Sequence, residues 1–128
     1  MTYVLGKRSR ERLDGVHSDL VEVVELAISY TSVDFSVLEG VRTPERQQKL
    51  FEAGASQTLN SRHITGHAVD LGAYIDGGIA WDWPLYDKIS AAVKRAAAEL
   101  GIPVVWGGDW TTLKDGPHFE LDRRHYSA

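Results

Sequence analysis

The sequence SRHITGHAVDLGAYI occupies residues 61–75 and joins a polar loop to a segment with the alternation of a β-strand. Side chains of a strand point to opposite faces in turn, so residues 68–75 predict two unlike faces. The first carries Ala68, Asp70 and Gly72, and the second carries Val69, Leu71 and Ala73. We expect the second face to pack on the core and the small residues of the first to leave open space around Asp70.

The residues before this strand predict two or three further elements. Apolar residues recur at three- and four-residue steps over residues 9–30 and predict a helix, which Gly15 could interrupt so that it begins as late as Ser18. Residues 33–39 alternate as a strand does. Thr43 and Pro44 suit the cap and first position of a helix that runs to about residue 53 and stops at Gly54.

A polar loop precedes the strand of residues 68–75, and a further helix and further strands are predicted after it. A polar loop covers residues 55–65, and the turn Asp76-Gly77-Gly78 leads toward residues 79–81. Residues 84–100 predict a helix that Gly101 ends, and residues 104–106 and 119–121 predict short strands. Helices and antiparallel-looking strands without regular alternation predict an α+β fold.

Composition limits what such a chain can be. Its 128 residues, with 43% hydrophobic and 25% charged residues, fit a single domain over residues 1–128. A net charge of −4 argues against nucleic-acid binding, which normally needs a basic patch. The chain has no cysteine, so any metal must be bound by His and carboxylate ligands. No apolar run is long enough for membrane insertion, and we expect no secretory signal peptide.

The polar residues on either side of the strand could form a zinc site. A catalytic zinc ion takes three protein ligands and leaves one position open for water. His63, Asp70 and His118 would meet this need, and Asp115 would be left to act on the water. The alternatives are ordinary ones: Asp70 could cap a turn, and Asp115 with Gly116 is a common turn pair. Composition and spacing leave both interpretations open.

The motif Ser61-x-His63-x-x-Gly66-x-Ala68-x-Asp70, followed by Asp115-x-x-His118, resembles the signature of the zinc D-Ala-D-Ala carboxypeptidase family. Within that family the chain looks most like the phage-endolysin-type L-alanyl-D-glutamate endopeptidases. The segments EGVRTPERQ (39–47), QKLFEAG (48–54) and WGGDW (106–110) agree with the resemblance in the same order. The family fold is a small antiparallel sheet with flanking helices, about three here, and a His/Asp zinc site at the sheet edge of a groove.

The resemblance also implies roles for individual residues. It assigns His63, Asp70 and His118 to one catalytic Zn²⁺, and it makes Asp115 the general base for a zinc-activated water. Arg42 matches an arginine that binds and polarises the substrate carbonyl, although an arginine more often pairs with a surface carboxylate. Ser61 matches a substrate-side hydroxyl but could instead cap its loop.

The sequence leaves more than one role open for several other residues near the expected site. The tryptophans that flank the expected site, Trp106 and Trp110, are candidates for substrate contact, or for core or groove wall. His67 is expected near the site or in solvent rather than as a fourth ligand, which would close the open position. Asp109 could shape its loop or support the metal, and Glu120 shares strand parity with His118.

The expected activity is hydrolysis of bacterial peptidoglycan stem peptides between L-Ala and D-Glu. One alternative is a D,D- or L,D-carboxypeptidase, which needs a pocket for a terminal carboxylate, and another is a non-catalytic zinc-bearing module that binds the wall. We expect a monomer that is made in the cytoplasm, leaves through a holin-type release system and acts on the wall in the periplasm.

Overall fold

The structure is a computed structural model that describes residues 2–56, 58 and 61–127. Within these residues the chain forms four α-helices, five strands and one 3₁₀ turn. In chain order they are α1 (Lys7–Arg12), α2 (Ser18–Tyr30), β1 (Phe35–Glu39), α3 (Pro44–Glu52), β2 (Ala68–Ile75), β3 (Gly78–Ala80), α4 (Trp83–Leu100), β4 (Val104–Trp106), η1 (Gly107–Asp109) and β5 (His118–Leu121).

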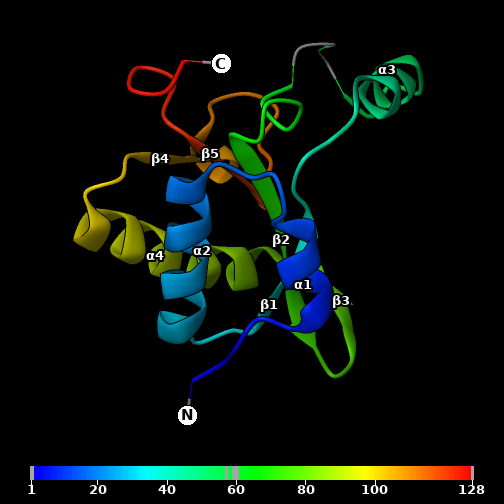
Figure 1. Cartoon of the computed structure of the whole chain (residues 1–128). Helices are drawn as coiled ribbons and strands as arrows, with labels where there is room; N and C mark the ends of the chain where they lie inside the picture. Colours follow the sequence, from blue (N-terminus) through cyan, green and yellow to red (C-terminus); the bar gives the residue numbers. More distant parts are fainter. Residues whose placement is uncertain (1, 57, 59–60, 128) are drawn as a thin grey trace.

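The strands form one antiparallel sheet in the order β1-β2-β5-β4, and the short β3 pairs with β2. Helices α2 and α4 lie side by side and pack against it (Figure 1). The α+β class and the small antiparallel sheet are therefore confirmed. In place of about three helices there are four in the described residues, because α1 is a separate short helix.

Gly15 explains why the predicted first helix divides. Its φ is +84°, a left-handed conformation that glycine adopts without steric cost, and it lies between α1 and α2. The side chain of His17 accepts a hydrogen bond from the Asp19 N–H, so α2 begins at Ser18. The interruption at Gly15, which the sequence left open, is confirmed.

One face of the sheet belongs to the hydrophobic core. Apolar residues that pair across the strands, such as Val37 with Leu71 and Val69 with Phe119, all point to this face. They are fully buried and pack with Leu20 and the rest of the apolar residues of α2 and α4 in one cluster. This is the burial expected from the alternation of residues 68–75.

The opposite face carries a row of polar side chains. Glu39 pairs with Asp70 in the register of β1 and β2, and Asp70 pairs with His118 in the register of β2 and β5. Directly opposite residues of antiparallel strands have neighbouring side chains on the same face. The register thus brings together residues 39, 70 and 118, which lie far apart in the sequence.

The expected open space over Gly72 is absent. A Cβ atom at Gly72 would lie 2.7 Å from Cδ1 of Leu38, so that side chain covers the glycine. Gly72 therefore allows Leu38 to lie close to the sheet, and the space beside Asp70 is occupied by the two histidines described below.

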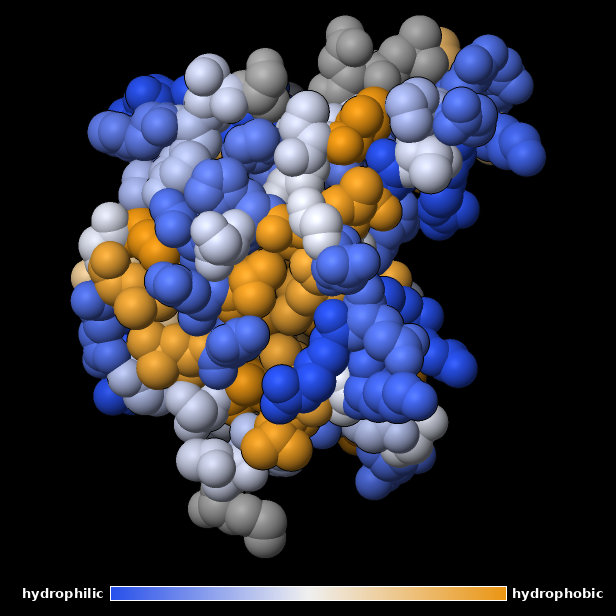
Figure 2. Space-filling view, viewed as in Figure 1, coloured by the Kyte–Doolittle hydropathy of each residue, from blue (hydrophilic) through white to orange (hydrophobic). Residues whose placement is uncertain are grey.

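Helix α3 is exposed on nearly all sides. Thr43 caps it by accepting from the Arg46 N–H, and Pro44 occupies its first turn, as expected. Gln47 is its one buried residue within the described part of the chain. In Figure 1 the helix lies away from the sheet, and Figure 2 shows it as a largely hydrophilic projection. None of the described helices is long and apolar enough to cross a membrane.

Candidate metal centre

Three side chains from separate segments meet on the polar face of the sheet. His63 comes from the loop before β2, Asp70 from β2 and His118 from the first position of β5. One ligand atom of each, imidazole nitrogen or carboxylate oxygen, lies within 4.8 Å of the others. The two histidines are buried, and Asp70 is half-buried. The structure thus brings together the three residues that the sequence proposes as metal ligands.

The hydrogen bond of His63 determines which ring nitrogen faces the cluster. Its Nδ1 lies 2.9 Å from the carbonyl oxygen of Gly40. A carbonyl only accepts, so Nδ1 carries the proton and the other nitrogen, Nε2, keeps its lone pair in the neutral ring. Nε2 lies 3.3 Å from Oδ1 of Asp70. His63 therefore offers the cluster a nitrogen ready to bind a cation.

Glu120 orients the ring of His118, which turns its Nδ1 toward Asp70, whereas His63 turns its Nε2 there. Nε2 of His118 lies 2.9 Å from Oε1 of Glu120, and its Nδ1 lies 3.4 Å from Oδ1 of Asp70. The buried Glu120 also accepts from Nε of Arg123 at 3.0 Å. A carboxylate that accepts from the outer nitrogen of a metal-binding histidine fixes its orientation and increases its basicity. Glu120, whose role the sequence left open, has this position.

Charge within the cluster favours a cation. Burial opposes ionisation of Asp70, but the imidazoles of His118 and His63 beside it outweigh burial and hold the Asp70 pKa below its ordinary value. Burial would lower the pKa of His118, yet Asp70 and Glu120 on either side raise it to about 9. A proton on His118 balances the two carboxylates in the metal-free protein, and a metal ion between the ligands would replace it.

The cluster passes a simple test of fit for zinc. Nε2 of His63 and Oδ1 of Asp70 are buried, and neither has a hydrogen-bond partner among the described residues. Burying polar atoms without a partner costs folding free energy, and a cation bound between these two atoms would offset that cost. Two imidazole nitrogens and one carboxylate oxygen are donors that zinc prefers, and three protein ligands leave a fourth position free.

Arg42 points its guanidinium at this cluster. Its Nε donates to Glu39, its NH1 donates to Oε1 of Gln47 at 2.7 Å, and its NH2 lies 3.7 Å from Oδ2 of Asp70. The backbone N–H of Arg42 also donates to the carbonyl of His63. Two side-chain acceptors thus fix the plane of the guanidinium beside the metal ligands.

Asp115 lies on the wall of a groove of about 410 Å³ that also contains His63, His118 and Arg42. Loss of hydration in the groove raises the pKa of Asp115 above its ordinary value, and the negative charge of Asp70 raises it further. Its backbone is close to Gly107, where a Cβ atom would lie 2.4 Å from the Asp115 carbonyl oxygen. The absence of a side chain at residue 107 lets the 107–117 loop fold back and bring Asp115 to the groove.

The remaining proposed contacts divide into two groups. Ser61 and Trp110 line the groove, and Oγ of Ser61 also accepts from the backbone N–H of His63, so Ser61 orders its own loop. Trp106 is 6% exposed, stacks on Phe119 and donates its indole N–H to the Gly116 carbonyl. The expectation that Trp106 contacts substrate is therefore corrected: it is a core residue that supports the 107–117 loop.

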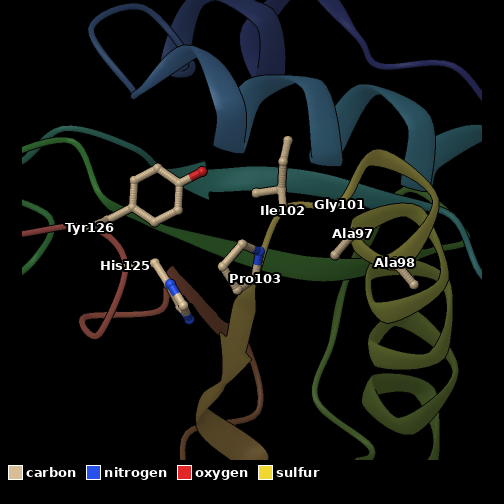
Figure 3. Close-up of a pocket in the computed structure, with 7 residues that line it drawn as sticks. All are labelled: Ala97, Ala98, Gly101, Ile102, Pro103, His125 and Tyr126. Atoms are coloured by element: carbon tan, nitrogen blue, oxygen red, sulfur yellow. The ribbon is translucent and has the colours of Figure 1, made fainter.

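Two other polar residues lie outside the cluster. Nδ1 of His67 is paired with the hydroxyl of Thr65, and His67 is not among the grouped ligands. Asp109 forms an exposed ion pair with Lys94 at 2.7 Å rather than supporting a metal ligand. A separate hollow near the end of α4 is lined by Ile102, Tyr126 and mostly small residues (Figure 3), and it shares no lining residue with the groove.

Two supporting residues escaped the sequence analysis. Gln47 is fully buried and bonds to Arg42, and Arg62 is buried while it donates to the carbonyls of Leu121 and Tyr126. Both bonds to these carbonyls come from NH2 of Arg62, while its Nε lies 3.8 Å from Oε2 of Glu120, so Arg62 joins the loop before β2 to β5 and the C-terminal segment. The Arg62 bonds join residues 59 and 64 positions apart, and the Gln47 bonds join α3 to the segments on either side of it, so neither set follows from the periodicity of one element.

The chain matches a family model described as "Phage L-alanyl-D-glutamate peptidase" over residues 1–127. The chain belongs to this family. The L-alanyl-D-glutamate peptidase of Escherichia phage T5 is 33% identical to it over 132 residues, which cover 100% of this chain and 96% of the relative. The crystal structure of the Serratia marcescens L-Ala D-Glu endopeptidase ChiX is 55% identical and aligns with a TM-score of 0.93, covering 98% of this chain and 95% of ChiX.

A more distant member of the same fold also aligns. The structure of the vancomycin-resistance D,D-pentapeptidase VanY in complex with Zn(II) is 20% identical, with a TM-score of 0.52, and covers 81% of this chain and 69% of VanY. At 20% identity this similarity shows a shared fold and nothing about activity. Membership of the peptidase family therefore rests on the match over nearly the whole chain and on the two relatives above.

Proposed function

We propose that this chain is a zinc-dependent endopeptidase that hydrolyses the L-Ala–D-Glu bond of bacterial peptidoglycan stem peptides. The observation that carries the proposal is the cluster of His63, Asp70 and His118, whose ligand atoms converge beside a groove containing Asp115 and Arg42. Family membership supports the bond specificity, since the matching model and the T5 relative are named for L-alanyl-D-glutamate peptidases.

Each residue of the site has a separate role in hydrolysis. When bound by His63, Asp70 and His118, zinc supplies Lewis acidity toward the substrate carbonyl and toward water. Asp115 accepts the proton of the attacking water and returns it to the departing amine, a task for which a raised carboxylate pKa is suited. Arg42 places positive charge where the carbonyl oxygen becomes negative. Ser61 and Trp110 line the groove, where they would contact the peptide.

The shape around the site favours an endopeptidase over a carboxypeptidase. The groove adjoins a second hollow, and the two share the lining residues Trp110, Leu113, Glu120 and Arg123. We infer that a bound peptide extends from the groove into this hollow, whereas a carboxypeptidase must stop its substrate at a terminal carboxylate. The groove-lining Asp115 also argues against a module that only binds the wall, because such a module needs no general base.

The setting of the activity is part of the proposal. Residues 1–128 form one catalytic domain that acts as a monomer on the stem peptide in the wall and binds no nucleic acid. Synthesis in the cytoplasm and release through a holin-type system would bring it to the periplasm. The phage origin of the T5 relative supports such a route, and the bacterial origin of ChiX is compatible with a role in wall remodelling.

Fragment masses test the bond specificity. Purified peptidoglycan is digested with the zinc-loaded protein, and the products are identified by mass spectrometry. The proposal predicts new fragments with N-terminal D-Glu. Release of free D-Ala without these fragments would instead identify a carboxypeptidase, and unchanged peptidoglycan that remains bound to the protein would identify a binding module.

A further inference from the structure

Gln47 is an unusual residue for an exposed helix. All its neighbours in α3 are exposed or half-buried, whereas Gln47 is 0% exposed. An amide is expensive to bury unless its polar atoms are paired. Here they are paired: Oε1 accepts from NH1 of Arg42 at 2.7 Å, and Nε2 donates to Oγ of Ser56 at 2.7 Å and to the Thr58 carbonyl at 2.5 Å.

The partners of Gln47 leave only one orientation for its amide. A guanidinium can only donate, so the atom that faces Arg42 must be the oxygen. A carbonyl can only accept, so the atom that faces Thr58 must be the nitrogen. A glutamate could serve Arg42 but not Thr58, and a lysine could serve Thr58 but not Arg42. Glutamine therefore joins a cation to an acceptor in a way that its charged relatives cannot.

These bonds join two parts of the same groove. Arg42 and the residues Ser56 and Thr58 all line it, and Gln47 lies behind them. Glu39 holds the Nε side of the Arg42 guanidinium, and Gln47 holds NH1, so NH2 is left to face Asp70. Without Gln47, the guanidinium would keep one side-chain acceptor and could turn about its bonds.

We propose that Gln47 is a positioning residue, which orients the guanidinium of Arg42 toward the reacting carbonyl and fixes it relative to the groove wall at Ser56. The inference deepens the proposed function, because Arg42 acts on the peptide that the site cleaves. Gln47 itself is buried and does not reach the substrate. Its effect on the reaction passes through Arg42.

Rotation of the Arg42 guanidinium tests this role without any substrate. NMR measures rotation about its Cζ–Nε bond in the full chain. We expect slow rotation in the wild type and faster rotation in Gln47→Met, which has a similar size but offers NH1 no acceptor. Gln48→Met is the matched control, because Gln48 is exposed and, among the described residues, its side chain bonds to Glu52 of its own helix. Equal rotation in Gln47→Met and the wild type would overturn the proposal.

Gln47→Glu separates the two sides of the amide. This variant keeps an acceptor for Arg42 and loses the donor toward Ser56, so rotation of the guanidinium should stay slow. Rotation as fast as in Gln47→Met would contradict an effect that depends on the acceptor.

A double-mutant cycle then tests the consequence for catalysis. In the zinc-loaded protein, Gln47→Met should lower kcat on a stem peptide by about tenfold, the size expected for loss of one charge-assisted hydrogen bond. In an Arg42→Ala background the same change should cause no further loss. Losses that multiply in the double variant would show that Gln47 acts independently of Arg42 and would refute the proposal.

The two assays keep the two proposals apart. A wild-type protein that cleaves no stem peptide would refute the proposed function, and the NMR comparison would still decide whether Gln47 holds Arg42. A cleaving protein in which Gln47→Met leaves kcat unchanged would retain the proposed function and refute the role of Gln47.

Discussion

Leu71 and Asp70 are neighbours in β2, yet they belong to two different environments. Leu71 faces the helices and is fully buried among apolar side chains of α2, α4 and the sheet. Asp70 faces the other way, between His63, His118 and Arg42. Apolar packing is non-directional and tolerates small adjustments, whereas the polar row depends on hydrogen bonds between specific atoms. The two faces should therefore respond to substitution in separable ways.

The largest effect is expected from removing a metal ligand. His63→Ala deletes one of three protein ligands and should abolish stoichiometric zinc binding and cleavage. The fold should persist, because the apolar face is untouched. Elemental analysis measures the zinc content, and circular dichroism checks that the fold persists. A His63→Ala protein that keeps one zinc ion per chain would break the ligand assignment.

Asp115→Ala should reduce turnover while leaving the metal in place. A general base contributes about 10²- to 10⁴-fold to rate, so kcat should fall by about that factor. Asp115 is not in the ligand cluster, and zinc content should stay at the wild-type value. Steady-state kinetics with a stem peptide provide the measurement. An active Asp115→Ala variant would remove this residue from the mechanism.

Leu71→Ala is the matched change on the opposite face. Truncation of a buried leucine costs about 2–5 kcal/mol of unfolding free energy, through lost burial and the cavity left behind. Chemical denaturation should show this loss, while zinc affinity below the transition should change little. A Leu71→Ala protein that is as stable as the wild type but deficient in zinc would show that the two faces are not separable.

Glu120→Gln should have the smallest effect. The variant keeps an oxygen that can accept from Nε2 of His118 but loses the negative charge. Substitution of such supporting groups weakens metal affinity by about 10- to 100-fold, and we expect the lower part of that range. Competition with a chelator of known affinity measures the change. An unchanged affinity would mean that Glu120 serves only to pair Arg123.

The same comparison explains what could be predicted from the sequence. The alternation of residues 68–75 identifies β2 with its observed bounds, because one face is uniformly apolar and a shift by one residue would expose it. Gly15, Thr43 and Gly101 marked helix ends because the backbone conformation or a local side-chain cap determines those positions. Local chemistry of this kind is visible in a single sequence.

The polar face was less predictable. The residues alone offered His63, Asp70 and His118 as one possibility, and the family resemblance selected them. The row of Glu39, Asp70 and His118 depends on strand register. Strand parity placed Glu120 on the same face as His118, but neither parity nor helical periodicity identifies the hydrogen bonds that Glu120 and Gln47 make. For Trp106 the sequence left substrate contact, groove wall and core open, because proximity to the site in sequence does not distinguish them.

Zinc stoichiometry coupled to activity tests the central claim most directly. The protein is stripped with a chelator, titrated with zinc and assayed for cleavage of a stem peptide after each addition. We predict that cleavage is lost on stripping and returns in proportion to zinc, reaching its full value at one ion per chain. Full cleavage by the metal-free protein would contradict the account.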